Sequence, residues 1–140
     1  MANEAVIVEL SGQPKGEARD FTITDTNAVE KGAIMGLSDP RTCSGSAIDA
    51  VGGMFAGIAA AEKVASDGQT NLACWTKGIF DLTVAPGGIV DVGNYVSISG
   101  ANLIKAATVN EINCSGGSVI GRALEAGSAS EVIEVAVGER

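Results

Sequence analysis

Two stretches of this chain are repeated, which indicates that the chain folds into two similar units that pack together. Residues 28–38 (AVEKGAIMGLS) match residues 89–99 (IVDVGNYVSIS) at an offset of 61. Residues 70–78 (TNLACWTKG) match residues 130–138 (SEVIEVAVG) at an offset of 60. Two copies are too few for a solenoid, so the duplication predicts one domain built from two similar β-units.

The repeats divide the chain into an N-terminal arm and a larger domain. Each copy ends on a glycine, which gives pseudo-repeats 28–78 and 89–138 inside a domain that covers residues 28–140. Residues 1–27 stand outside both copies and contain the arm and the first strands. A total of 140 residues is an ordinary size for one domain with its own core.

The glycine content favours short strands over helices. The chain has 19 glycines, and glycine weakens helix interiors while it serves tight turns and bulges. Alternating apolar and polar runs recur along the chain with turn signals between them, as in sandwiches and barrels. The sequence therefore predicts an all-β fold: a single compact β-barrel or sandwich domain with an extended N-terminal arm. Residues 59–66 (AAAEKVAS) are read as an elaborated turn that could contain the one short helix.

The charge and hydropathy of the chain exclude several partners. The net charge of −8 argues against nucleic acid, because phosphate binding needs a basic stripe. No apolar run approaches the roughly 20 residues of a membrane span, and the apolar stretch near the N-terminus is too short for a signal peptide. We therefore expect no membrane partner, and synthesis in a cytoplasm.

The residues that catalysis and metal binding need are scarce. The chain contains no histidine, which removes Ser-His-Asp and Cys-His machinery and Cys/His zinc sites. Cys43, Cys74 and Cys114 are an odd number with no close spacing, so we expect reduced thiols and no disulfide within the chain. A carboxylate pair such as Glu131 and Glu134 is read as an exposed strand face. The sequence predicts no enzyme, no cofactor, no metal and no small-molecule ligand.

The N-terminal arm carries a short apolar strand, AVIVEL (5–10), followed by a Gly/Pro-punctuated spacer. An isolated strand leaves its backbone groups unpaired unless a partner supplies a sheet edge. We therefore expect this strand to add to the edge of a partner's sheet, by β-augmentation. The alternative is that it pairs within its own domain or with a sister subunit.

Residues 56–82 (AGIAAAEKVASDGQTNLACWTKGIFDL) resemble the head decoration, or capsid cement, proteins of tailed phages, those of the lambda kind. The pattern V-[E/D]-x-G-x-x-φ-x-[L/I]-S and the closing EVIEVAVGE are similar to related small β-rich cement proteins. The resemblance implies a structural virion protein, usually a homotrimer, on the outer surface of an expanded icosahedral head. Its partner would be the major capsid protein, whose neighbouring subunits it would clamp to stabilise the head. Assembly would take place in the host cytoplasm.

Two sets of contact residues follow as hypotheses. The arm strand supplies the expected capsid contacts, Val6, Ile7, Val8 and Leu10. Two aromatic residues, Trp75 and Phe80, are the expected subunit contacts.

Three other function classes stay open at the level of the sequence. They are a tail- or fibre-associated virion β-domain, a non-enzymatic β-barrel subunit of a cellular complex, and a small hydrolase or lyase that works through carboxylates alone.

Overall fold

The computed structural model of the chain describes residues 3–10, 18–45, 54–108 and 118–138. Within these residues every regular element is a strand, so the all-β prediction is confirmed. The strands of the N-terminal half are β1 (Val6–Leu10), β2 (Ala18–Thr22), β3 (Ile34–Ser38), β4 (Thr42–Ser44), β5 (Phe55–Ala59) and β6 (Asn71–Trp75). Those of the C-terminal half are β7 (Gly78–Val84), β8 (Ile89–Val90), β9 (Tyr95–Gly100), β10 (Leu103–Ala106), β11 (Val119–Ala123), β12 (Gly127–Ser128) and β13 (Val132–Val137).

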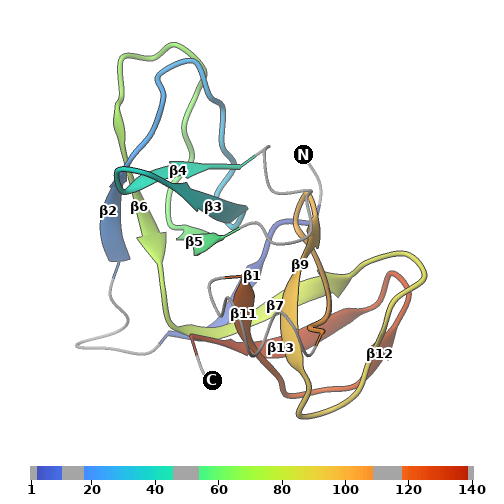
Figure 1. The fold of residues 1–140 in the computed structure, drawn as a ribbon. Helices are drawn as coiled ribbons and strands as arrows, with labels where there is room; N and C mark the ends of the chain where they lie inside the picture. The colour runs from blue at the N-terminus through green and yellow to red at the C-terminus, as the bar shows by residue number, and fades with distance from the viewer. Residues whose placement is uncertain (1–2, 11–17, 46–53, 109–117, 139–140) are drawn as a thin grey trace.

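The strands form two small barrels that lie side by side (Figure 1). The first barrel closes in the order β2-β4-β3-β5-β6. The second runs β7-β10-β9-β11-β13 and closes where β13 pairs with β7. Strand β1 comes from the N-terminus but joins the second barrel, at the edge of β7.

The two barrels have the same strand order and the same directions of pairing. In each barrel the first strand is parallel to its third (β2 with β4, β7 with β10) and antiparallel to its last (β2 with β6, β7 with β13). The repeated structural unit therefore begins at β2 in the first half and at β7 in the second half, before residues 28 and 89. The sequence carries this correspondence, because DFTI (20–23) and DLTV (81–84) also match at an offset of 61.

The pairing of the last strand in each unit shows that the two units are related by an offset of 61 there as well, and not by the offset of 60 expected from the sequence. Phe21 pairs with Leu72 in the first barrel, and Leu82, its counterpart, pairs with Ile133 in the second. An offset of 60 would instead match the buried Leu72 to the exposed Val132. A slip of one residue moves every side chain of a strand to the opposite face, so the buried positions decide the alignment.

One glycine in each barrel lets two strands approach closely. Gly57 on β5 and Gly121 on β11 pair with equivalent residues, and both strands are bulged at the same place. A Cβ at Gly57 would lie 2.7 Å from the carbonyl oxygen of Trp75, and a Cβ at Gly121 would meet the carbonyl of Ala136. Trp75 and Ala136 are themselves counterparts, so one local constraint explains both glycines.

One apolar core cluster crosses the boundary between the two barrels and joins them into one compact domain. Ile34 and Ile58 belong to the first barrel but pack with the core of the second, together with Ala5 from the N-terminal arm. The interior of the first barrel is smaller and contains two buried thiols, Cys43 and Cys74. Their counterparts in the second barrel are larger aliphatic residues, Ile104 and Val135.

Candidate functional site

The N-terminal strand β1 is paired within the chain, which the sequence did not lead us to expect. It runs antiparallel to β7, with Val6 opposite Asp81 and Leu10 opposite Gly78, and a bulge lies between Ile7 and Glu9. The expected isolated strand is thus held by a segment far along the chain, as the alternative interpretation had it.

The residues just before β1 fasten the arm to the first barrel. The Ala5 N–H donates to the Gly32 carbonyl at 2.6 Å. Gly32 has a φ of +91°, and a Cβ there would meet the carbonyl of Ala5, so only glycine suits both the turn and the contact. Ala5 is buried as a result, and the arm bridges both barrels.

Asn102, in the turn between β9 and β10, ties the arm and the two barrels together. Its Oδ1 accepts a hydrogen bond from the Ile34 N–H at 2.9 Å, and its Nδ2 donates to Glu4 Oε2 at 3.2 Å. Partial burial and a hydrogen bond with Glu30 raise the pKa of the Glu4 carboxyl above its ordinary value. The arm is therefore held by side chains as well as by its strand ladder.

Three consecutive side chains of the arm are apolar and exposed. Val6, Ile7 and Val8 are 59%, 37% and 46% exposed, whereas the side chain of Leu10 lies outside the described part of the structure. A hollow of about 260 Å³ lies between the arm and the first barrel, lined by Ala5, Val6, Ile7, Lys31, Gly32, Ile58, Ala59 and Trp75. The structure thus brings three of the four expected capsid contacts together on one element.

The two expected subunit contacts occupy different environments. Trp75 is half-buried at the wall of this hollow, and its indole N–H is buried without a hydrogen-bond partner among the described residues. Phe80 is fully buried in the core of the second barrel. It alternates with the buried Leu82 and Val84 along β7, and alternate residues of a strand share one face. Phe80 therefore supports the core and offers no surface to a second subunit, which leaves Trp75 as the proposed contact.

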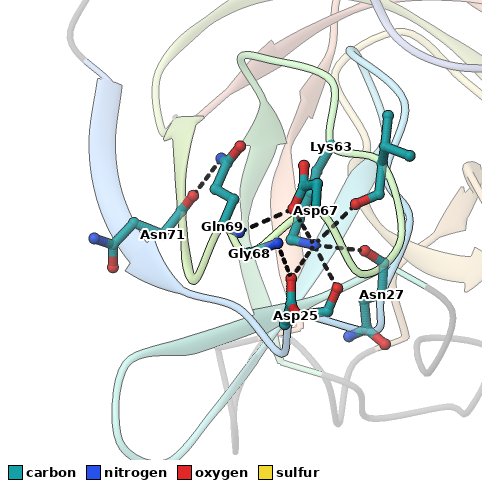
Figure 2. A network of polar contacts seen from close by, with 8 residues as sticks. Asp25, Asn27, Lys63, Asp67, Gly68, Gln69 and Asn71 are labelled. Atoms are coloured by element: carbon teal, nitrogen blue, oxygen red, sulfur yellow. Dashed lines mark hydrogen bonds and ion pairs between the residues drawn. The ribbon is translucent and has the colours of Figure 1, made fainter.

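A buried lysine organises the end of the first barrel (Figure 2). The Lys63 side chain is fully buried, and its Nζ donates to the carbonyls of Asp25 (2.6 Å), Asn27 (3.1 Å) and Val64 (3.2 Å). It also forms ion pairs with the carboxylates of Asp25 at 3.6 Å and Asp67 at 3.1 Å. Residues 59–66, where a short helix was allowed, contain the end of β5 and then an irregular loop in which Lys63 forms a β-bridge with Val29. A lysine next to Glu62 in an alanine-rich loop looks solvent-exposed, so sequence reasoning missed it.

The other reactive side chains are buried or take part in local structure. Cys43 and Cys74 are free thiols in the first barrel that hydrogen-bond to each other. That bond, together with burial, raises the pKa of Cys74. Cys114 lies outside the described residues. Glu131 accepts hydrogen bonds from Ser128.

The described ranges contain no group of three or more His, Cys, Asp or Glu side chains able to hold a metal ion. They also contain no helix that is long and apolar enough to cross a membrane.

Comparison with protein families identifies the chain. The profile of the phage cement proteins matches residues 13–138 of the 140 residues, which spans both barrels. The chain belongs to the phage cement protein family. The resemblance to capsid cement proteins is thereby confirmed, and with it a structural role in association with a phage capsid. A search of curated proteins finds none that matches the chain.

Proposed function

We propose that this cement protein binds the outer surface of an expanded phage head and clamps neighbouring subunits of the major capsid protein. It does so as a homotrimer, without catalysis, cofactor or metal. The family supports capsid association, and the chemistry of the chain suits a clamp, which needs a stiff domain and apolar contact surfaces. A trimer would engage several shell subunits at once and gain affinity through multivalency.

The exposed apolar side chains of β1 are the single observation that carries the proposal. Three adjacent aliphatic side chains, Val6, Ile7 and Val8, are exposed on a strand whose backbone is already fixed. Exposed apolar patches on soluble proteins mark contact surfaces. Because the β7 ladder and Ala5 hold the arm in place, little conformational entropy remains to be lost when a partner covers these side chains.

The test places a charge in this surface without disturbing the ladder. Val6→Asp and Val8→Asp alter exposed side chains, so the fold is retained. Burying a valine is worth about 1.5 kcal/mol or more, so each variant should bind expanded empty heads about tenfold more weakly or worse. Cosedimentation with the heads measures the affinity. Val64→Asp is the matched control, because Val64 is similarly exposed but lies in the loop between β5 and β6 and not on β1.

Three results would count against the proposal. Equal binding by all three variants would remove the arm from the contact. Binding to tail tubes but not to heads would favour a tail-associated role. A monomeric mass at the concentrations that saturate heads would remove the trimer, and Trp75→Ala, which should weaken the trimer, tests the proposed subunit contact.

A further inference from the structure

Among the described residues, one edge of β2 is open. β2 pairs with β6 along its whole length, but with β4 only where Thr22 meets Thr42. The Thr22 N–H faces the β4 side, because it donates to the Arg41 carbonyl at 3.0 Å. Backbone groups two residues apart on a strand face the same way, so those of Ala18 and Asp20 also face this side. No described residue pairs with them there.

The second barrel shows what fits such an edge. The counterparts of Ala18 and Asp20 on β7 are Ile79 and Asp81. There β1 fills the edge, with Val6 opposite Asp81 and Glu9 opposite Ile79. The duplication has thus produced two equivalent strand edges, and among the described residues a strand, β1, fills only one of them.

The turn beside each edge indicates the charge of the strand that fits. Arg41 and Asn102 are counterparts, both with a left-handed backbone (φ of +46° and +58°). In the second barrel, Asn102 donates to Glu4, the residue two positions before β1. In the first barrel the equivalent turn carries a guanidinium, which lies 5.7 Å from the centre of the Phe21 ring. A carboxylate in the place of Glu4 would therefore meet a positive charge.

A hollow follows the open edge. It is positively charged, although the chain as a whole has a net charge of −8. Its volume is about 500 Å³, and it is lined by Ala18, Arg19, Asp20, Phe21, Thr22, Arg41 and Asn71. Two exposed guanidinium groups stand there against a single carboxylate. The charge complements an acidic strand.

We propose that the open edge of β2 binds an extended segment of the capsid subunit, antiparallel to β2, with aliphatic residues and a carboxylate that reaches Arg41. The segment adds a sixth strand to the first barrel in the way that β1 adds one to the second. This inference rests on the proposed function for the identity of the partner. It gives the protein a second contact with the shell, on the barrel that does not pair with β1.

The edge is tested with a fluorescein-labelled peptide of residues 3–10 (NEAVIVEL), the sequence that fills the equivalent edge. Fluorescence anisotropy of the peptide, titrated with the full chain, should show saturable binding. Asp20→Pro should weaken it about tenfold or more, because proline removes the N–H that faces the open edge. Asp20→Ala removes the same carboxylate but keeps that N–H, and should bind at least as tightly as the parent.

Arg41→Glu reverses the charge of the turn and should also weaken peptide binding about tenfold. Because the Arg41 side chain is exposed, this variant carries the test if Asp20→Pro fails to fold. Peptide binding that is the same in all variants would overturn the proposal, since the peptide would then sit elsewhere.

Cosedimentation with expanded empty heads tests the partner. Weaker head binding by Asp20→Pro and Arg41→Glu than by Asp20→Ala is the expected result. Equal head binding by the three would refute the shell segment as occupant and leave the proposed function intact. Failure of the parent protein to bind heads at all would refute both. Self-association that Asp20→Pro abolishes would assign the edge to a second copy and overturn the proposal.

Discussion

Replacing Lys63 by methionine should destabilise the protein more than any surface substitution. Methionine keeps the apolar stem but removes the ammonium group, which donates three hydrogen bonds to backbone carbonyls at 2.6, 3.1 and 3.2 Å. Hydrogen bonds from charged donors contribute about 1.5–3 kcal/mol each. Part of this is recovered because the ammonium is no longer taken out of water on folding.

The expected loss in the free energy of unfolding is about 3 kcal/mol, within the range of about 3–5 kcal/mol for breaking a buried pair. Urea unfolding, with the midpoint and slope compared between variants, measures it. Lys77→Met is the matched control: it removes a charge from an exposed side chain and should cost about 0.5 kcal/mol or less. A loss below about 1 kcal/mol for Lys63→Met would show that water replaces the ammonium, and would refute the reasoning.

Three further predictions follow from the fold. Gly121→Ala should cost about 2–3 kcal/mol by overpacking, whereas Gly87→Ala, with open space around it, should cost about 1 kcal/mol; equal urea midpoints would contradict this. Hydrogen bonds from the Ser128 side chain and N–H lower the pKa of the exposed Glu131 carboxyl below 4.5, so it stabilises the fold above that pH and the contribution is lost as the pH falls through the lowered value. Glu131→Gln should therefore show a smaller drop in Tm between pH 7 and pH 3 than the parent. Alkylation of the unfolded chain without reductant should label all three cysteines, whereas a mass deficit of two daltons would reveal a disulfide.

The sequence was sufficient for the all-β class and the plan of two similar units, because repetition and alternation can be seen within the strands themselves. The paired glycines and the alternation of Phe80 with Leu82 and Val84 fix the type of element and its buried face without knowledge of the partner strand. The same alternation would have corrected the offset of the last strand, since it matches Leu72 to Ile133.

The partner of β1 could not be predicted, because strand pairing depends on which edges the rest of the chain leaves open. An apolar strand looks the same in sequence whether it adds to another protein or to β7. Lys63 was missed for a related reason, since its burial depends on carbonyls that two separate loops bring together. The open edge of β2 could not be predicted either, because it follows from the equivalence of β2 and β7 in the folded barrels.

The pairing of β1 with β7 also has a consequence for the order in which the chain folds during synthesis. The first barrel uses only β2 to β6, so it can close as soon as residue 75 has left the ribosome. Strand β1 is synthesised first but cannot pair until β7 has been made, because the partner of Val6 is Asp81. It therefore docks only when the second barrel begins to form. Until then its aliphatic side chains and backbone are free to pair with other nascent chains. Glutamates at positions 4 and 9 flank this strand with negative charge, which discourages such pairing during the interval.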